Sequence, residues 1–298
     1  MGKKDKLDFD RFKITDGNKF SLSDYPTEIK IKDLDKEEGE LLIQKDIEEL
    51  ATLQDVLYAD NRHSVLIVIQ AMDAAGKDGT IKHIMSGVNP SGVKVSSFKS
   101  PSSTELDHDY FWRHYAALPG KGEIGIFNRS HYENVLITKV HPEFIMNERH
   151  SSIKSVKDID KQFWQDRYKQ ICRFEKNLTE NDTTILKFFL HVSKDVQKKR
   201  FLDRIDDPEK NWKFSTADLK ERAFWDEYQS AYEDAIMNTS TKSEPWFIIP
   251  ADVKWYTRYL VGNIICNELK KLDLSYPVIS DTERETLLKA KEALLNEI

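Results

Sequence analysis

The stretch Val65-Leu-Ile-Val-Ile-Gln-Ala-Met-Asp-Ala-Ala-Gly-Lys-Asp-Gly-Thr80 decides the fold. Its first part, Val65–Gln70, is an unbroken run of β-branched and long apolar residues, which is typical of a strand buried on both faces of a parallel sheet. A loop containing Gly76 and Lys77 follows, and then a segment with helical apolar periodicity. Strand, glycine-containing loop, lysine and helix predict an anion-binding turn, because loop N–H groups and the helix N-terminus converge on negatively charged oxygens.

The same alternation of strand and helix continues on both sides of this stretch. Strands are predicted at 65–70, 93–98, 123–128, 183–192 and 246–249. Helices are predicted at 36–57, 104–118, 155–178, 193–205, 215–238 and 254–271. This order favours one α/β domain over residues 1–298 with a mainly parallel five-stranded sheet. We expect residues 1–34 to form an arm over the core, about 193–235 to form a pair of lid helices, and 281–298 to form a polar C-terminal helix.

The loop departs from the G-x-x-x-x-G-K-[ST] pattern of phosphate-binding loops in two places. Ala71 replaces the first glycine, and Asp78 replaces the hydroxyl residue that usually contacts magnesium. Lys77 supplies a movable positive charge, and Asp73 is the nearest carboxylate for a metal, unless it only stabilises the loop as an Asx turn. An ordinary strand-to-helix turn with a surface lysine is the alternative. The other candidate phosphate contacts are Ala74, Ala75, Gly76, Asp78, Gly79 and Thr80.

A second group of polar residues follows the predicted strand 123–128. Asn128 and Arg129 stand at its end, and Glu133 follows on a helical turn. Arginine can hold a phosphate with two hydrogen bonds, and we predict that Asn128 and Glu133 join Asp73 around a metal. The alternative for Glu133 is a capping box with Ser130.

A third group, rich in basic residues, lies after the predicted strand 183–192. Arg200 and Arg204 are four residues apart and therefore share one helix face. Lys210 and Lys213 follow in the break before the next helix, which Ser215 is predicted to cap. Two helices with a basic tip suit a lid that closes over phosphates and excludes water. A solvated charged helical hairpin is the alternative.

Together these motifs resemble the polyphosphate kinase family 2. The resemblance rests on Gln70-Ala-Met-Asp-Ala-Ala-Gly-Lys77, on Ile126-Phe-Asn-Arg-Ser-His-Tyr-Glu133 and on Arg204-Ile-Asp-Asp-Pro-Glu-Lys-Asn-Trp-Lys213, and it covers roughly residues 35–270. It implies a three-layer α/β/α P-loop kinase fold with a helical lid. It also implies reversible, magnesium-dependent phosphate transfer between inorganic polyphosphate and a nucleotide, with Mn²⁺ as a substitute metal. The form with Asn128 is similar to the subgroup that phosphorylates both nucleoside mono- and diphosphates.

The resemblance also implies roles for the residues quoted above. Asp73 and Lys77 match the family's functional loop residues, and Asn128, Arg129 and Glu133 match its second motif. Arg200 and Arg204 fall in its lid. AMP and ADP are the expected acceptors, with GMP and GDP left open. Two other functions remain: an ATP-dependent nucleoside monophosphate kinase, and a non-catalytic sensor of nucleotide or polyphosphate.

Composition limits the other classes of function. The chain has 298 residues with 45 Lys and Arg against 51 Asp and Glu, so its formal net charge is −6. An acidic chain is not a general nucleic-acid coat protein, although it can hold a local basic pocket. No apolar run approaches the length of a membrane span, and the N-terminus lacks the apolar stretch of a secretory signal. We therefore expect a cytoplasmic protein with no nucleic-acid or membrane partner, and we expect a homo-oligomer.

Overall fold

The computed structural model describes residues 9–29 and 34–297. The strands are β1 (Lys13–Ile14), β2 (Ser64–Ala71), β3 (Val93–Ser97), β4 (Ile124–Asn128), β5 (Thr183–His191) and β6 (Trp246–Pro250). The helices are α1 (Lys36–Asp60), α2 (Lys77–Ile84), α3 (Ser103–Leu106), α4 (Trp112–Tyr115), α5 (Ile137–Val140), α6 (Lys161–Thr179), α7 (Lys194–Asp206), α8 (Thr216–Ala223), α9 (Trp225–Thr239), α10 (Lys254–Leu269) and α11 (Asp281–Leu295).

The six strands form one sheet in the order β1-β6-β5-β2-β4-β3. From β6 to β3 all neighbours are parallel, with β2 between β5 and β4. All eight residues of β2 are buried, as the unbroken apolar run predicts. Because the five parallel strands end at one edge, the loops that follow them come together there.

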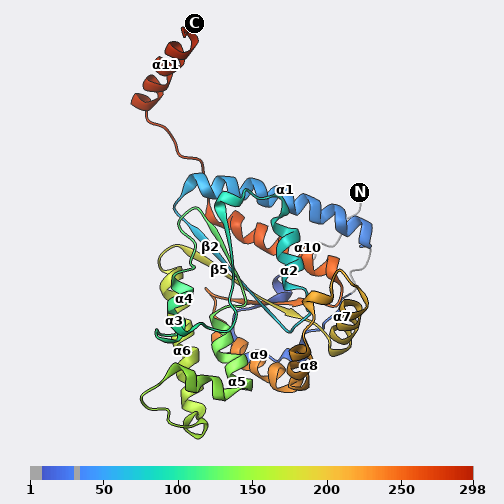
Figure 1. The fold of residues 1–298 in the computed structure, drawn as a ribbon. Coiled ribbons are helices and arrows are strands. Elements are labelled where there is room, and N and C mark those ends of the chain that lie inside the picture. The colour runs from blue at the N-terminus through green and yellow to red at the C-terminus, as the bar shows by residue number, and fades with distance from the viewer. Residues whose placement is uncertain (1–8, 30–33, 298) are drawn as a thin grey trace.

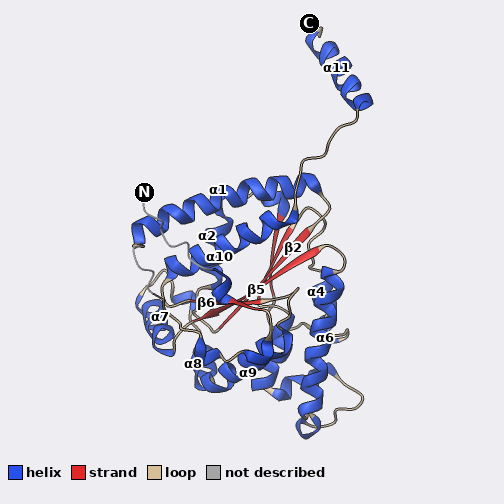
Figure 2. Ribbon diagram, turned by 180° about the vertical axis from the view of Figure 1, so that it is seen from behind, coloured by secondary structure: helices blue, strands red, loops and turns tan. Residues whose placement is uncertain are grey.

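Helices cover both faces of the sheet and give three layers (Figures 1 and 2). Helices α1, α2 and α10 pack together on one face, and α5, α6 and α9 pack together on the other. Helices α7 and α8 lie at the side of the molecule, next to the strand ends (Figure 2). The expected α/β/α architecture is confirmed. The segment of about 193–235, which is expected to form the lid, contains α7, α8 and most of α9, and α9 packs against α5 and α6.

The prediction of five strands is wrong by one. The missing strand, β1, lies in the expected N-terminal arm and pairs antiparallel with β6. A strand of two residues has no periodicity to detect, so the sequence pattern could not show it. Phe12, Ile14, Phe20 and Leu22 of the arm are buried in the core. Residues 1–8 and 30–33 of the arm lie outside the described residues.

Three predicted helices are shorter than expected. The segment 104–118 contains α3 and α4 instead of one helix, because Asp109 Oδ1 accepts a hydrogen bond from Phe111 N (2.8 Å) and forms a turn between them. The segment 215–238 breaks at Phe224 into α8 and α9. Helix α6 begins at Lys161 rather than Ser155, because Asp160 caps it.

The predicted C-terminal helix exists as α11, and it leads away from the rest of the molecule (Figures 1 and 2). Each of its residues from Asp281 to Leu295 is exposed. Ser280 and Glu283 form a capping box at its start. Among the described residues, no helix has both the length and the apolar character needed to cross a membrane.

Candidate active site

The loop between β2 and α2 presents backbone N–H groups at the start of α2. Ala74 and Gly76 have positive φ angles of 60° and 108°. A Cβ on Gly76 would meet no atom within 4 Å, so its backbone angle, and not lack of space, favours glycine there. Gly76 is the N-cap residue of α2, and as a glycine it has no side chain to accept a hydrogen bond from the first turn. The N-terminus of α2 therefore remains available to an anion.

Lys77 lies across this loop. Its Nζ donates to the carbonyl oxygens of Ala71 (2.7 Å) and Met72 (3.4 Å). Burial lowers the pKa of Lys77, and the carboxylate of Asp73 acts in the opposite direction. The ammonium group is thus held at the carboxyl edge of β2, where the sequence predicts a movable charge.

Arg129 connects the two motifs that the sequence predicts separately. Its Nη2 donates to Asp73 Oδ1 at 3.1 Å, and its backbone N donates to Ile69 O of β2 at 3.2 Å. Burial acts to lower the pKa of Arg129, but the charges of Glu133 and Asp73 outweigh it, and the pKa is raised. Arg129 has φ 59°, so the chain turns sharply at the end of β4.

Glu133 faces this site and does not form the capping box. Ser130 Oγ accepts a hydrogen bond from Tyr132 N (3.2 Å), so Ser130 caps the 3₁₀ turn His131–Val135. In the amide orientation that gives both polar atoms of the Gln70 side chain a hydrogen-bond partner, its Nε2 donates to Glu133 Oε1 at 3.0 Å. Burial raises the pKa of Glu133, and Arg129 and Lys77 oppose that rise. The carboxyl of Glu133 therefore belongs to the same charged group as Asp73.

Asn128 bonds to Asp78, the residue that stands where phosphate-binding loops usually have a Ser or Thr whose hydroxyl contacts magnesium. Its Nδ2 donates to Asp78 Oδ1 (2.6 Å) and to Ser97 Oγ (3.4 Å). Its Oδ1 is buried and has no hydrogen-bond partner among the described residues. A buried acceptor without a donor suits a hard cation. Within residues 9–29 and 34–297, however, no three His, Cys, Asp or Glu side chains lie close enough together to bind a metal ion by themselves.

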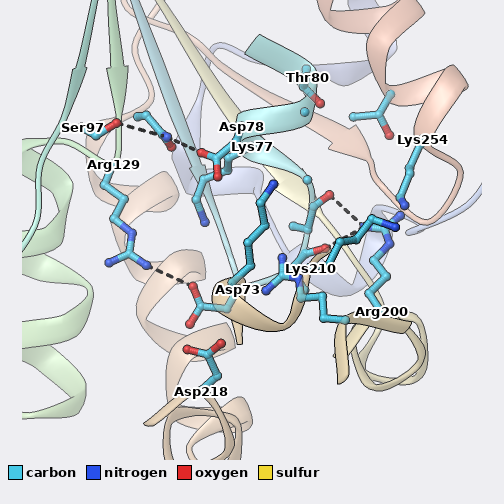
Figure 3. Close-up of a pocket in the computed structure, with 18 of the residues that line it drawn as sticks. Asp73, Lys77, Asp78, Thr80, Ser97, Arg129, Arg200, Lys210, Asp218 and Lys254 are labelled. Carbon is cyan, nitrogen blue, oxygen red and sulfur yellow. Dashed lines mark hydrogen bonds and ion pairs between the residues drawn. The ribbon is translucent and has the colours of Figure 1, made fainter. Parts of the chain in front are cut away.

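One cavity of about 990 Å³ is lined by Asp73, Lys77, Asp78, Asn128 and Arg129, among others (Figure 3). Four aspartates line it: Asp73, Asp78, Asp203 and Asp218. Nine basic residues line it: Lys77, Lys99, Arg129, Arg200, Arg204, Lys210, Lys213, Lys254 and Arg258. A chain with net charge −6 thus gathers an excess of positive charge in one cavity. That arrangement fits an extended anion.

The predicted lid residues all line this cavity, but Arg200 makes buried contacts with the backbone and the other three are more exposed. Arg200 is buried, and its guanidinium donates to four backbone carbonyls: Ala74 (3.0 Å), Ala75 (2.8 Å), Ala251 (2.7 Å) and Asp252 (3.0 Å). These contacts tie the loop to the end of β6 and differ from the closing role expected for Arg200. Arg204, Lys210 and Lys213 line the cavity with more exposed side chains. Lys210 pairs with Asp207, and Lys213 lies over the Trp212 ring.

Several charged residues of the cavity lie outside the motifs that the sequence shows. Lys254 and Arg258 come from the first turns of α10, Lys99 follows β3, and Asp218 is on α8. Burial raises the pKa of Asp218, and the charge of Asp73 adds to that rise. Lys254 and Arg258 follow the last strand and share a helix face, so the reasoning used for Arg200 and Arg204 could have found them.

A second cavity of about 220 Å³ adjoins the first. Both are lined by Phe98, Lys99, Ser100 and Arg129. The second also contains Glu133 and the side chains of Tyr110, Arg113 and Phe144. Arg129 therefore stands where a long basic cavity meets a smaller one with aromatic walls.

Comparisons with known proteins agree with this geometry. A sequence profile described as Polyphosphate kinase 2 matches residues 33–276. An ADP-polyphosphate phosphotransferase of Rhodopseudomonas palustris is 47% identical over 290 residues, which cover 97% of this chain and 99% of that protein. An AMP/ADP-polyphosphate phosphotransferase of Meiothermus ruber is 50% identical over 228 residues, or 76% of this chain and 80% of that protein.

The fold is shared with a solved structure. The crystal structure of Polyphosphate Kinase 2 from Arthrobacter aurescens superimposes with a TM-score of 0.83 at 37% identity, and it covers 94% of this chain and 95% of that one. The family profile spans the loop at Lys77, the turn at Arg129 and helices α7 and α8. The chain belongs to the polyphosphate kinase 2 family of phosphotransferases.

Proposed function

We propose that this chain transfers phosphate from inorganic polyphosphate to AMP and ADP, and that it also runs the reverse reaction. The observation that carries the proposal is the pair of cavities that meet at Arg129. The larger basic cavity suits a chain of phosphates, and the smaller one suits a nucleotide whose phosphate reaches Arg129. The names of the relatives from Rhodopseudomonas palustris and Meiothermus ruber support polyphosphate and these two nucleotides as substrates.

The main task of the site is to bring two anions together. Two unit charges 4 Å apart repel by roughly 4 kcal/mol at an effective dielectric constant near 20. Lys77 and Arg129 flank the point where the donor and acceptor phosphates would meet, and the basic residues of the larger cavity hold the rest of the donor. Phosphoryl transfer needs positioning and charge stabilisation more than covalent help from the protein.

No strong general base is needed, because the attacking oxygen of a nucleotide phosphate already carries charge. Arg129, whose guanidinium is held by Asp73, would orient that oxygen. Since one phosphoanhydride bond breaks as another forms, the direction of the reaction depends on substrate concentrations.

Magnesium fits this site as a shared ligand of protein and substrate. Mg²⁺ is usually held by one or two carboxylates together with phosphate oxygens and waters, so a cage made only of protein is not required. Asp73, Glu133 and the unpartnered Oδ1 of Asn128 are the oxygen donors that would hold it. When bound, the ion neutralises phosphate charge.

The first test is incubation of the purified chain with AMP, magnesium and long-chain polyphosphate, without ATP, followed by chromatography. We expect ADP first and then ATP. ATP from added ADP, with no product from AMP, would keep the donor but remove AMP as an acceptor. ADP formed from AMP and ATP, with no reaction of polyphosphate, would favour the ATP-dependent monophosphate kinase. Binding of both substrates without turnover would favour the sensor.

A further inference from the structure

A charged pair lies in the core beneath the second motif. Lys187 is in the middle of β5 and Glu175 is on α6; their side chains are 0% and 1% exposed, and Lys187 Nζ lies 2.6 Å from Glu175 Oε2. The same ammonium donates to Tyr132 Oη (3.1 Å) and to Thr239 O (2.8 Å). A buried lysine on a central strand is costly unless all its protons find acceptors, and here three acceptors surround it.

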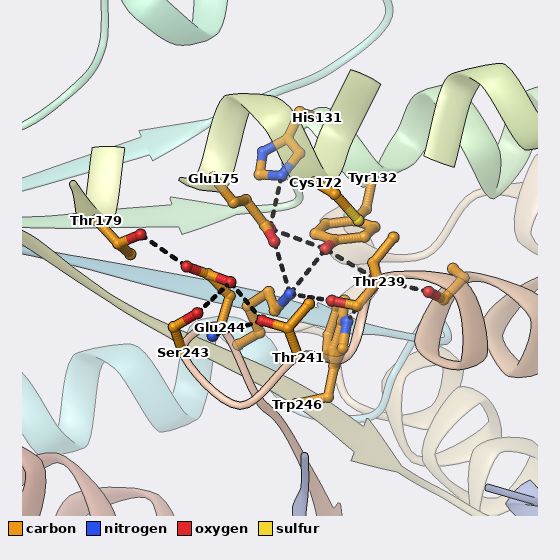
Figure 4. A network of polar contacts seen from close by, with 12 residues as sticks. His131, Tyr132, Cys172, Glu175, Thr179, Thr239, Thr241, Ser243, Glu244 and Trp246 are labelled. Atoms are coloured by element: carbon orange, nitrogen blue, oxygen red, sulfur yellow. Dashed lines mark hydrogen bonds and ion pairs between the residues drawn. The ribbon is translucent and has the colours of Figure 1, made fainter. Parts of the chain in front are cut away.

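The pair reaches the second motif through the other oxygen of Glu175. Tyr132 Oη donates to Glu175 Oε1 at 2.8 Å, and His131 Nε2 lies 3.2 Å from the same atom (Figure 4). Tyr132 Oη also lies 3.0 Å from Thr239 Oγ1 on α9. Both rings are fully buried. One carboxylate thus holds two consecutive side chains of the motif.

These two side chains stand between the residues that carry the site. Arg129 precedes them and Glu133 follows them, and the chain here is a 3₁₀ turn of five residues entered through a positive φ. Such a short turn has little hydrogen bonding of its own to fix its orientation. Anchoring His131 and Tyr132 in the core leaves Arg129 and Glu133 on the opposite side, toward the cavities.

We propose that Lys187 and Glu175 are positioning residues for phosphate transfer: they anchor His131 and Tyr132 and thereby fix the placement of Arg129 and Glu133. The inference rests on the proposed function, because the effect is measured in that reaction. It assigns His131 a structural anchor role and no direct part in the chemistry.

The rival explanation is that the pair only stabilises the fold. The two explanations separate because replacing both members of a buried ion pair by apolar residues of similar size often leaves stability unchanged or higher. Removing only one member leaves an unpaired charge and destabilises the protein. The double variant Lys187→Met/Glu175→Met therefore removes the anchor while keeping the core filled.

The experiment compares three proteins with the wild type. In Lys187→Met/Glu175→Met we expect a folded protein whose urea midpoint is at most slightly lowered, because Tyr132 and His131 lose one acceptor. We also expect a fall in kcat of about tenfold or more and a raised KM for ADP, since a 1 Å misplacement can cost about a hundredfold. In Lys187→Met/Glu175→Gln, where an acceptor remains for Tyr132 and His131, we expect most of kcat and KM to return. The distant pair Lys13–Glu268 provides the control, and Lys13→Met/Glu268→Met should change neither constant.

A shift in KM is the decisive measurement, because partial unfolding lowers the amount of active enzyme without moving KM. A Lys187→Met/Glu175→Met protein with wild-type kcat and KM would overturn the proposal. If that variant does not fold, Tyr132→Phe decides: it keeps the ring in the core and removes only the hydroxyl. Wild-type kinetics in Tyr132→Phe would also overturn the proposal, and lowered kcat with a raised KM would support it.

The experiment also distinguishes failure of the anchor proposal from failure of the proposed function. A wild-type protein that forms no product from polyphosphate and nucleotide contradicts that function. The anchor is then judged by the affinity for tripolyphosphate, measured by calorimetry, which misplacement of Arg129 should weaken. Equal affinity in the wild type and in Lys187→Met/Glu175→Met would overturn the inference by itself.

Discussion

Lys77 is the residue whose loss should affect the reaction most directly. Among the residues that the structure describes, its ammonium bonds only to the loop carbonyls of Ala71 and Met72, so little of the core depends on it. We expect Lys77→Ala to lower kcat by at least about a hundredfold, as loss of one well-placed donor does elsewhere, with an unchanged urea midpoint. The exposed Lys82 on the same helix provides the control as Lys82→Ala. Near-normal turnover in Lys77→Ala would remove Lys77 from the site.

Arg200 and Arg204 lie one turn apart and test two different roles for arginine. Arg200 makes four hydrogen bonds to carbonyls, which a lysine ammonium on a flexible stem cannot reproduce. We expect Arg200→Lys to lower kcat by about tenfold or more and Arg204→Lys to raise mainly the KM for polyphosphate. Steady-state kinetics with both substrates distinguish them. Equal, small effects would show that the four contacts do not shape the loop.

His114 should make stability depend on pH. It is 0% exposed, and burial lowers its pKa to about 2, with the charges of His131 and Arg113 acting in the same direction. Below pH 6.5 the unfolded chain binds a proton that the folded chain excludes, so the free energy of unfolding falls as pH falls. The slope from this group approaches about 1.4 kcal/mol per pH unit. Urea unfolding at pH 6.5 and pH 4.5 should therefore show a smaller loss in His114→Asn than in the wild type.

The exposed His108 provides the control for losing an imidazole from the same region. A His114→Asn protein that loses as much stability between the two pH values as the wild type would contradict the buried, neutral state of His114.

At the scale of the element, α11 does not pack against any other part of the described structure. All its residues from Asp281 to Leu295 are exposed, including Leu287, Leu288 and Leu294. We expect removal of residues 280–298 to leave the thermal midpoint and kcat unchanged. Differential scanning fluorimetry at two protein concentrations checks this. A full-length midpoint that falls on dilution, together with a lower, concentration-independent midpoint in the truncated protein, would show that α11 packs against another copy.

At the scale of the whole molecule, the separation of charge should make the two substrates respond differently to salt. The larger cavity concentrates nine basic residues in an acidic chain. Salt screens such interactions over about 8–10 Å at moderate ionic strength. We expect the KM for long polyphosphate to rise several-fold between about 50 and about 300 mM KCl, and to rise more than the KM for AMP. Parallel titrations measure both, and equal changes would contradict an extended anion in this cavity.

Two further expectations concern the whole molecule and stay predictions. Sedimentation of the purified chain tests the homo-oligomer. Fractionation of cells tests the cytoplasmic location.

Much of the candidate site was predictable from the sequence because its residues lie in the segments that come after the parallel strands. Lys77, Arg129 and Arg200 lie in the segments that follow β2, β4 and β5, and parallel strands bring such segments to one edge of the sheet. The departures have local causes: β1 is too short to show a pattern, and Asp109 and Phe224 interrupt helices that periodicity alone would continue.

The sequence by itself determined the alternation of strands and helices, the place of the glycine-containing loop between strand and helix, and the family, because these depend on local order along the chain. Only the tertiary structure decided that Arg200 clamps carbonyls, that Glu133 joins Asp73 and does not cap a turn, and that Lys187 pairs with Glu175 beneath the motif. Those outcomes depend on which residues distant in sequence meet after folding. Local spacing cannot encode them, since the same side chain can cap, clamp or bind a phosphate according to its neighbours in space.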